Sequence, residues 1–316
     1  MNKKAYFEIL RPGINSTLQD LGRQNQYHIG IPFSGAMDKR NYLISNQLVS
    51  NKLEKPVIEF AYQGPRLKLK FGEATCAITG KVSFNIIKNN KTLTGQCYEA
   101  FNIGMDDEID ILSTNKSVYG YLAVNKGFKG ESFWGSYSVN TKAKIGSNNG
   151  AKFSKDEKIY LTDNKCISNK KKINYINSKI EYIRVLEGTN FNYFSKEATK
   201  IFFNNKFIVS KLSDRMGMRL EGLKIENKVS TNIKSEGLIK GVIQVPADGK
   251  PIIMLSDHGT IGGYPKIAVV ISADYDRIVQ SVPGSNIKFK LVNLSEAENL
   301  YKLYNMETQN ILSQIR

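Results

Sequence analysis

The stretch GVIQVPADGKPIIMLSDHGTIGGYPKIAVVISAD, residues 241–274, contains the strongest fold signals in this chain. The apolar runs VIQVP and PIIML flank the turn ADGK, in which Asp248-Gly249 is typical of a β-hairpin. Gly262-Gly263 allows a tight bend, Tyr264-Pro265 stiffens the chain again, and Lys266 stands at the start of the run IAVVISA. The stretch therefore predicts short strands joined by a hairpin and by a rigid, glycine-rich turn.

The same pattern of short apolar runs continues on both sides of this stretch. The runs are YFEILRPG, VIEFAYQG, RLKLKFG, ATCAITG, VYGYLAVNKG and EYIRVLEG, and each ends at or near a glycine. Such runs are typical of β-barrels and sandwiches rather than of βαβ units. Helical patterns are few: one starts near Asp38, which can cap it, and one starts at Ser295, which has capping-box spacing to Glu298. We expect a mainly β protein with a few short helices.

The segment DNKCISNKKKINYINSKI, residues 163–180, is polar and has no clear period. It therefore predicts a linker or long loop between two β-rich halves. The expected organisation is an N-terminal half over 1–165, a linker over 166–180, a C-terminal half over 181–294 and a terminal helix over 295–316.

Composition excludes several classes of function. The net charge is +16, but only nine of the 45 basic residues are arginine, the side chain that sequence-reading nucleic-acid proteins favour, so we expect no nucleic-acid partner. The three cysteines are widely spaced and there are only two histidines, which predicts a reduced, cytoplasmic protein without a bound metal. We find no secretory signal and no apolar run long enough to span a membrane.

The segment QDLGRQNQYHIGIPFSGAMD, residues 19–38, is dense in glycine and polar groups. Ser34-Gly35-Ala36 presents backbone N–H groups just before the helix that Asp38 caps, and such a helix start favours an anion. The simpler interpretation is a glycine-rich connection into a capped helix.

The segment SDRMGMRLEG, residues 213–222, places Asp214 beside Arg215, with Arg219 four residues on. Two arginines in a chain that is poor in arginine suggest a carboxylate or phosphate partner. An internal Asp–Arg pair that fixes a loop would use the same geometry, and the local sequence does not decide between them.

Two further residues in the opening stretch are candidates for chemistry. Lys266, at the mouth of a barrel, can hold a negative group, although a surface strand lysine is the alternative. His258 is either a functional group or a partly buried loop residue.

Taken together, the motifs resemble one family. They are TLQDLGRQNQYHIGIPFSGAMD, SNQLVSN, IEFAYQGPRL, AITG, YGYLAVNKGF, GSYS, IRVLEGT, LSDRMGMRLEG, GVIQVPADGKPIIMLSDHGTIGGYPKIAVVISAD and VPGSNIKF, in this order through nearly the whole chain. The chain resembles the C-type subunit of bacterial 5-oxoprolinase, also called the KipA or biotin-dependent carboxyltransferase family. It is also similar to the second half of the carboxyltransferase domain of urea carboxylase. It departs from the family at Gly259, where glutamine is usual, at Lys126-Gly127, and at Lys152, where arginine is usual.

The resemblance implies a fold of two cyclophilin-like β-barrel units. It also implies two partners, a KipI-like B-type subunit and a lactam-utilisation A-type subunit, in a complex that opens 5-oxo-L-proline to L-glutamate at the expense of ATP. In that reaction ATP phosphorylates the lactam oxygen, and water then attacks. The chain has no G-x-x-x-x-G-K-[ST] motif, so we expect no tightly bound cofactor here, ATP use by the complex, and little activity of the chain alone.

Two alternatives share the same fold. One is the carboxyltransferase component of a biotin-dependent urea or amide carboxylase, the only case that would involve biotin. The other is a non-catalytic antagonist of a KipI-like kinase inhibitor. For the leading function the expected catalytic residues are Lys266, Arg215, Asp214 and His258, and the expected substrate-binding residues are Ser34, Gly35, Arg219, Gln244, Gly262, Gly263 and Tyr264.

Overall fold

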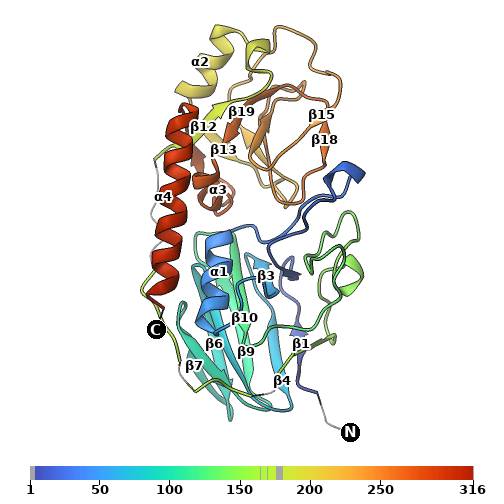
Figure 1. The fold of residues 1–316 in the computed structure, drawn as a ribbon, viewed down its shortest axis with the longest axis vertical. Coiled ribbons are helices and arrows are strands. Elements are labelled where there is room, and N and C mark those ends of the chain that lie inside the picture. The colour runs from blue at the N-terminus through green and yellow to red at the C-terminus, as the bar shows by residue number, and fades with distance from the viewer. Residues whose placement is uncertain (1–3, 164, 169, 176–180, 316) are drawn as a thin grey trace. The chain divides into compact units, whose positions relative to one another are not determined.

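The computed structural model describes residues 4–163, 165–168, 170–175 and 181–315. The chain divides into two compact units (Figure 1). Unit 1 consists of Met1–Gln24, Ser34–Ile176 and Thr308–Arg316, and unit 2 consists of Asn25–Phe33 and Asn177–Glu307. The major division falls within the expected linker, but two short segments are exchanged: residues 25–33 join unit 2, and the end of the C-terminal helix joins unit 1.

Part of the expected linker over 166–180 packs on unit 1. The backbone N–H of Ile167 donates to Thr75 Oγ1 (3.0 Å), and the N–H of Ile173 donates to the carbonyl of Tyr98 (3.0 Å). The carbonyl of Lys171 accepts from the N–H of Ala100 (2.8 Å). Residues 169 and 176–180 of this segment lie outside the described residues. The described part of the segment is therefore hydrogen-bonded to unit 1 rather than being a free linker.

Unit 1 contains two antiparallel sheets. One has the order β11-β1-β4-β9-β6-β7 and the other the order β2-β3-β10-β5-β8. The strands are β1 (Tyr6–Arg11), β2 (Thr17–Gln19), β3 (Val57–Ala61), β4 (Arg66–Lys70), β5 (Ala74–Thr79), β6 (Val82–Lys88), β7 (Lys91–Thr94), β8 (Ala100–Ile103), β9 (Glu108–Thr114), β10 (Tyr119–Val124) and β11 (Lys158–Tyr160).

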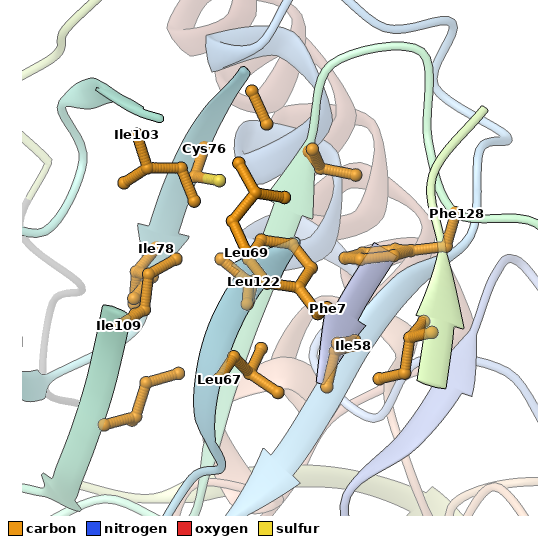
Figure 2. Close-up of a cluster of buried hydrophobic side chains, with 14 of the residues drawn as sticks. Phe7, Ile58, Leu67, Leu69, Cys76, Ile78, Ile103, Ile109, Leu122 and Phe128 are labelled. Carbon is orange, nitrogen blue, oxygen red and sulfur yellow. The ribbon is translucent and has the colours of Figure 1, made fainter. Parts of the chain in front are cut away.

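The core of unit 1 follows from the period-two pattern. In β4, Leu67 and Leu69 are buried while Arg66, Lys68 and Lys70 stay half-exposed, because alternate side chains of a strand point to opposite faces. These leucines share one core cluster with Phe7 of the adjacent strand β1 and with Ile58 and Leu122 of the other sheet (Figure 2). Burial of such side chains contributes about 1.5–3 kcal/mol each.

Strands β5 and β10 are buried at every position, so both of their faces are covered. The second face is covered by helix α1 (Lys39–Leu48), which contacts both strands. Asp38 caps this helix as predicted: its side chain accepts a hydrogen bond from the N–H of Asn41 (3.0 Å).

Unit 2 is built on an eight-stranded sheet of order β20-β13-β14-β17-β16-β19-β12-β21. The strands are β12 (Ile183–Glu187), β13 (Phe207–Val209), β14 (Gly217–Glu221), β16 (Val242–Gln244), β17 (Ile252–Met254), β19 (Lys266–Val270), β20 (Asn286–Ile287) and β21 (Phe289–Leu291). The two edge strands, β20 and β21, are separated in sequence only by Lys288, so the sheet nearly closes into a barrel. A separate ribbon pairs β15 (Glu236–Gly237) with β18 (Ile261–Gly262).

The hairpin predicted from Asp248-Gly249 is present, since β16 pairs antiparallel with β17 and Gly249 adopts a positive φ of 74°. The remaining helices are α2 (Lys196–Asn204), α3 (Ser272–Ile278) and α4 (Leu294–Ser313), with short 3-10 turns at Tyr27–Ile29, Asn148–Gly150 and Phe191–Tyr193. The expected fold class, mainly β with a few helices, is confirmed. Across the described part of the chain, no helix has the length and apolarity needed to cross a membrane.

Candidate functional site

A row of residues crosses four neighbouring strands of unit 2. Arg219 of β14 pairs with Ile252 of β17, Ile252 pairs with Gln244 of β16, and Gln244 pairs with Lys266 of β19. Directly paired residues of antiparallel strands point to the same face. With strands about 4.8 Å apart, the row is about 14 Å long. Arg219 and Gln244 therefore lie on one face of the sheet, and Lys266 lies beside Gln244 across an irregularity in the β16–β19 register.

Lys266 is the most buried charge in this row. Its Nζ lies 2.8 Å from Glu236 Oε2, and its side chain is 3% exposed whereas that of Glu236 is 43% exposed. The hydrogen bond from Lys266 holds the pKa of the Glu236 carboxyl below its ordinary value. Lys266 is therefore a buried cation whose counter-charge comes from a carboxylate at the surface.

The backbone around Lys266 is fixed on both sides. Its N–H donates to Asn190 Oδ1 (3.1 Å), and its carbonyl accepts from the N–H of Asn190 (3.2 Å). A Cβ at Gly188 would lie 2.2 Å from the Lys266 carbonyl oxygen, so only glycine allows the chain to pass here. The lysine thus projects from a rigid position.

Gly262, the last residue of β18, lies against Gln244 of this row, and Gly263 follows it. A Cβ at Gly262 would lie 2.7 Å from Gln244 Nε2 and 2.8 Å from Leu238 Cδ1. Gln244 Nε2 donates to the Tyr264 carbonyl (3.1 Å), and the Gly263 carbonyl accepts from the N–H of Ile233 (2.9 Å). Gly262 therefore leaves room for the ends of the Gln244 and Leu238 side chains, and it does not adopt a positive φ.

Arg215 binds a different carboxylate from the one beside it in sequence. Its guanidinium pairs with Asp257 in a bidentate manner, Nε to Oδ2 at 2.8 Å and Nη2 to Oδ1 at 3.1 Å, and both side chains are nearly buried. Asp214 instead accepts from the N–H groups of Met216 (2.9 Å) and Gly217 (3.2 Å), which stabilises its own turn. An internal Asp–Arg pair does fix this loop, but the aspartate is Asp257.

The structure separates Arg215 from Lys266. Arg215 lies in the bend just before β14 begins at Gly217, and β14 lies three strand spacings from β19. The carbonyl of Arg215 accepts from the N–H of Asp257 (2.9 Å), which continues the β14–β17 pairing beyond the Gly217–Met254 end. Arg215 therefore lies toward the other end of these strands and outside the row that holds Lys266.

His258 lies next to Asp257 and is 1% exposed. Its Nδ1 lies 2.6 Å from the Gly259 carbonyl oxygen and 3.4 Å from the hydroxyl of Tyr27, which donates to the Leu238 carbonyl. Burial lowers the pKa of His258 and raises that of Tyr27 to about 12. A neutral His258 that donates from Nδ1 to Gly259 keeps the lone pair on Nε2, the atom suited to act as an acceptor or a base.

Ser34 and Gly35 belong to unit 1, not to the unit that holds the other candidates. Ser34 is buried and accepts from Asn140 Nδ2 (3.2 Å), while a Cβ at Gly35 would lie 2.9 Å from Gly22 N. Ser34 and Gly35 therefore belong to a tightly packed connection rather than to an open loop.

The backbone donors before α1 are used within the fold. The N–H of Ala36 donates to the Asp20 carbonyl (2.9 Å), that of Met37 to Glu59 Oε2 (2.7 Å) and that of Asp38 to the Tyr121 hydroxyl (2.7 Å). Of the three donors that we expected to face an anion, the N–H of Ala36 is thus used by Asp20, and the carboxylate of Glu59 accepts from the next residue, Met37. The physical reason is that a buried helix start must satisfy its N–H groups, and this chain does so with its own side chains.

Sequence reasoning missed three partners: Glu236, Asn190 and Asp257. The sequence around Glu236 and Asn190 has no clear pattern, and Asp257 was quoted in its motif but not assigned to Arg215. Within the described ranges, no cluster of three or more histidine, cysteine, aspartate or glutamate side chains could hold a metal ion. The roles of the candidate residues, and the expectation of no metal, stay predictions.

Comparison with known proteins identifies the class of protein. Residues 29–291 match the family described as "Carboxyltransferase domain, subdomain A and B", and the chain belongs to that family. It is 30% identical over 309 residues to the C-type subunit of 5-oxoprolinase from Haemophilus influenzae, covering 98% of this chain and 97% of that protein. It is also 30% identical over 295 residues to the corresponding 5-oxoprolinase subunit of Escherichia coli, covering 92% of each. The resemblance predicted from the motifs is confirmed.

The second similarity is to urea-degrading enzymes. The chain is 27% identical to urea amidolyase of Saccharomyces cerevisiae, covering 93% of this chain but only 17% of that protein. The crystal structure of the Kluyveromyces lactis urea amidolyase superimposes with a TM-score of 0.87 at 25% identity, covering 98% of this chain and 20% of that one. The fold is therefore that of one part of a much longer enzyme.

Proposed function

We propose that the chain is one subunit of an ATP-dependent 5-oxoprolinase that converts 5-oxo-L-proline to L-glutamate. The observation that carries this proposal is the coverage in both directions: the chain and the H. influenzae 5-oxoprolinase subunit match over 98% and 97% of their lengths. The urea amidolyases match over a small part of their length only. Similarity of the whole chain to one such subunit supports the same kind of role.

The row that ends at Lys266 supports a role in binding the substrate. A fixed ammonium group in a buried position can orient a carboxylate, and a neighbouring amide such as that of Gln244 can hold a neutral polar group. The chain carries no P-loop, so in this proposal ATP is used by the complex with a KipI-like B-type subunit and a lactam-utilisation A-type subunit. The complex is proposed to be cytoplasmic.

The experiment is co-purification with the two proposed partners, followed by ATP hydrolysis and glutamate release with and without 5-oxo-L-proline. We expect the chain alone to release little glutamate, and the complete complex to couple ATP hydrolysis to the lactam. Robust ATP-dependent glutamate release by the chain alone would contradict the proposed division of labour. A complete complex that never acts on 5-oxo-L-proline would contradict the substrate.

A second candidate is carboxyl transfer to a urea-like amide in a biotin-dependent carboxylase. It is favoured by the family match and by the TM-score of 0.87 to the urea amidolyase. It needs a biotin carrier, so the same complex would be blocked by avidin. Partner binding without activity on either substrate would leave the regulatory role, an antagonist of a KipI-like kinase inhibitor.

A further inference from the structure

The two partners of the Lys266–Glu236 ion pair differ in exposure, and this difference suggests that another carboxylate can replace that of Glu236. The ammonium is 3% exposed and the carboxylate 2.8 Å away is 43% exposed. A buried ammonium is strongly unfavourable without an anion, so this position must always hold one. The anion present here, however, stands at the surface, where another carboxylate can replace it without moving the lysine.

The two partners also differ in how firmly they are held. Lys266 lies in a central strand between β16 and β12, and Asn190 fixes its backbone. Glu236 lies in the two-residue strand β15, which pairs only with the equally short β18. The neighbouring ties are single hydrogen bonds, from the N–H of Ile233 to Gly263 and from the N–H of Leu238 to Thr260, both 2.9 Å.

The segment that carries Glu236 is also exposed. Between residues 228 and 237 no side chain is buried, and most are exposed. Segments with few buried contacts and short pairing open at the low end of the stability range of a protein. The carboxylate is therefore the mobile partner and the lysine the fixed one.

We infer that Lys266 is a binding site for a ligand carboxylate and that Glu236 occupies this site as an internal competitor until the ligand displaces it. The inference deepens the proposed function, on which it rests for the identity of the ligand, because 5-oxo-L-proline carries a single carboxylate. Exchange of one carboxylate for another leaves the buried charge paired throughout.

Competition sets the size of the expected effect. When the competent state is only a fraction of the molecules, apparent affinity falls by that fraction, so a glutamate bound in about nine molecules of ten weakens the ligand about tenfold. Removal of the Glu236 charge should therefore raise the ligand affinity by the same factor of about ten. A structural ion pair would instead affect stability and leave affinity unchanged.

The test is an NMR titration of the full-length chain with 5-oxo-L-proline. We expect Glu236→Gln to bind about tenfold more tightly than the unmodified chain. Glu236→Asp, which keeps the charge with a shorter reach, should fall between them and serves if the glutamine variant does not fold. The matched control is Glu226→Gln, which removes the charge of an exposed glutamate in the same unit and should leave affinity unchanged. The lactam 2-pyrrolidinone, which has no carboxylate, should not distinguish the variants.

The site itself is tested by Lys266→Met in the Glu236→Gln background, which should abolish the gain. Equal affinity of Glu236→Gln and the unmodified chain, or a loss of thermal stability without a change in affinity, would overturn the inference. Acetate separates the two proposals. Tighter acetate binding by Glu236→Gln in a complex that never opens 5-oxo-L-proline would sustain the carboxylate site and reject the substrate. Turnover of 5-oxo-L-proline by the complex, with the same ligand affinity in Glu236→Gln as in the unmodified chain, would support the substrate and reject the competition by Glu236.

Discussion

Arg215 and Asp257 form a bidentate pair that is almost entirely withdrawn from solvent. The arginine side chain is 11% exposed and the aspartate 3%. Loss of one partner from such a pair leaves a buried charge unpaired. This residue pair therefore contributes to stability whether or not it also serves the reaction.

We expect Arg215→Ala to lower the free energy of unfolding by about 3–5 kcal/mol, because Asp257 would keep its charge without a partner. The measurement is urea unfolding followed by circular dichroism. Arg219→Ala is the matched control, since Arg219 is exposed and such surface changes stay within about 0.5 kcal/mol. Equal midpoints for the two variants would show that the Arg215 pair does not stabilise the fold.

At the scale of the element, the two strands of the β15–β18 ribbon each contain a glycine, Gly237 and Gly262. Gly262 packs against Gln244 and Leu238, whereas Gly237, in the strand opposite, has open space where a Cβ would be. The two glycines of the same small element therefore have different roles. One permits contact between the ribbon and the sheet, and the other is free to change.

We expect Gly262→Ala to destabilise the protein by about 1 kcal/mol, the lower end of the range for overpacking, because only the ends of the Gln244 and Leu238 side chains must shift. Gly237→Ala should change stability by less than about 0.5 kcal/mol. Thermal unfolding of both variants provides the comparison. A Gly237→Ala effect as large as that of Gly262→Ala would show that the cost comes from β-ribbon flexibility rather than from the contact with Gln244.

Local elements could be predicted from the sequence, and contacts between distant residues could not. The hairpin at Asp248-Gly249 and the helix capped by Asp38 depend on neighbouring residues, and both are present. The Lys266–Glu236 and Arg215–Asp257 pairs join residues 30 and 42 positions apart. Neither carboxylate has a periodic or turn signal that points to its partner, so only the folded register reveals them.

At the scale of the whole molecule, each unit includes a segment that is distant in sequence from the rest of that unit. Residues 25–33 belong to unit 2, and Thr308–Arg316, which include the end of α4, belong to unit 1. Within unit 1, Arg40 Nε donates to Thr308 Oγ1 (3.0 Å), and Leu312 is buried. The end of α4 thus completes a unit whose strands come from the first half of the sequence.

We expect Leu312→Ala to lower the free energy of unfolding by about 2–5 kcal/mol, as for other buried leucines. Met306→Ala, on the same helix but 68% exposed, is the control and should stay within about 0.5 kcal/mol. Differential scanning calorimetry resolves the effect. Equal transitions for the two variants would indicate that the end of α4 does not support unit 1.

The exchange of segments between the units has a consequence for synthesis on the ribosome. A chain emerging from its N-terminus cannot complete unit 1 until residues 308–316 leave the exit tunnel, although the strands of that unit all come before residue 161. Unit 2 likewise cannot close its barrel until β20 and β21 emerge. Both units therefore finish only after these late segments have been made. While residues 183–291 are being made, the incomplete sheet of unit 2 carries unpaired strand edges, and in this interval aggregation competes with folding.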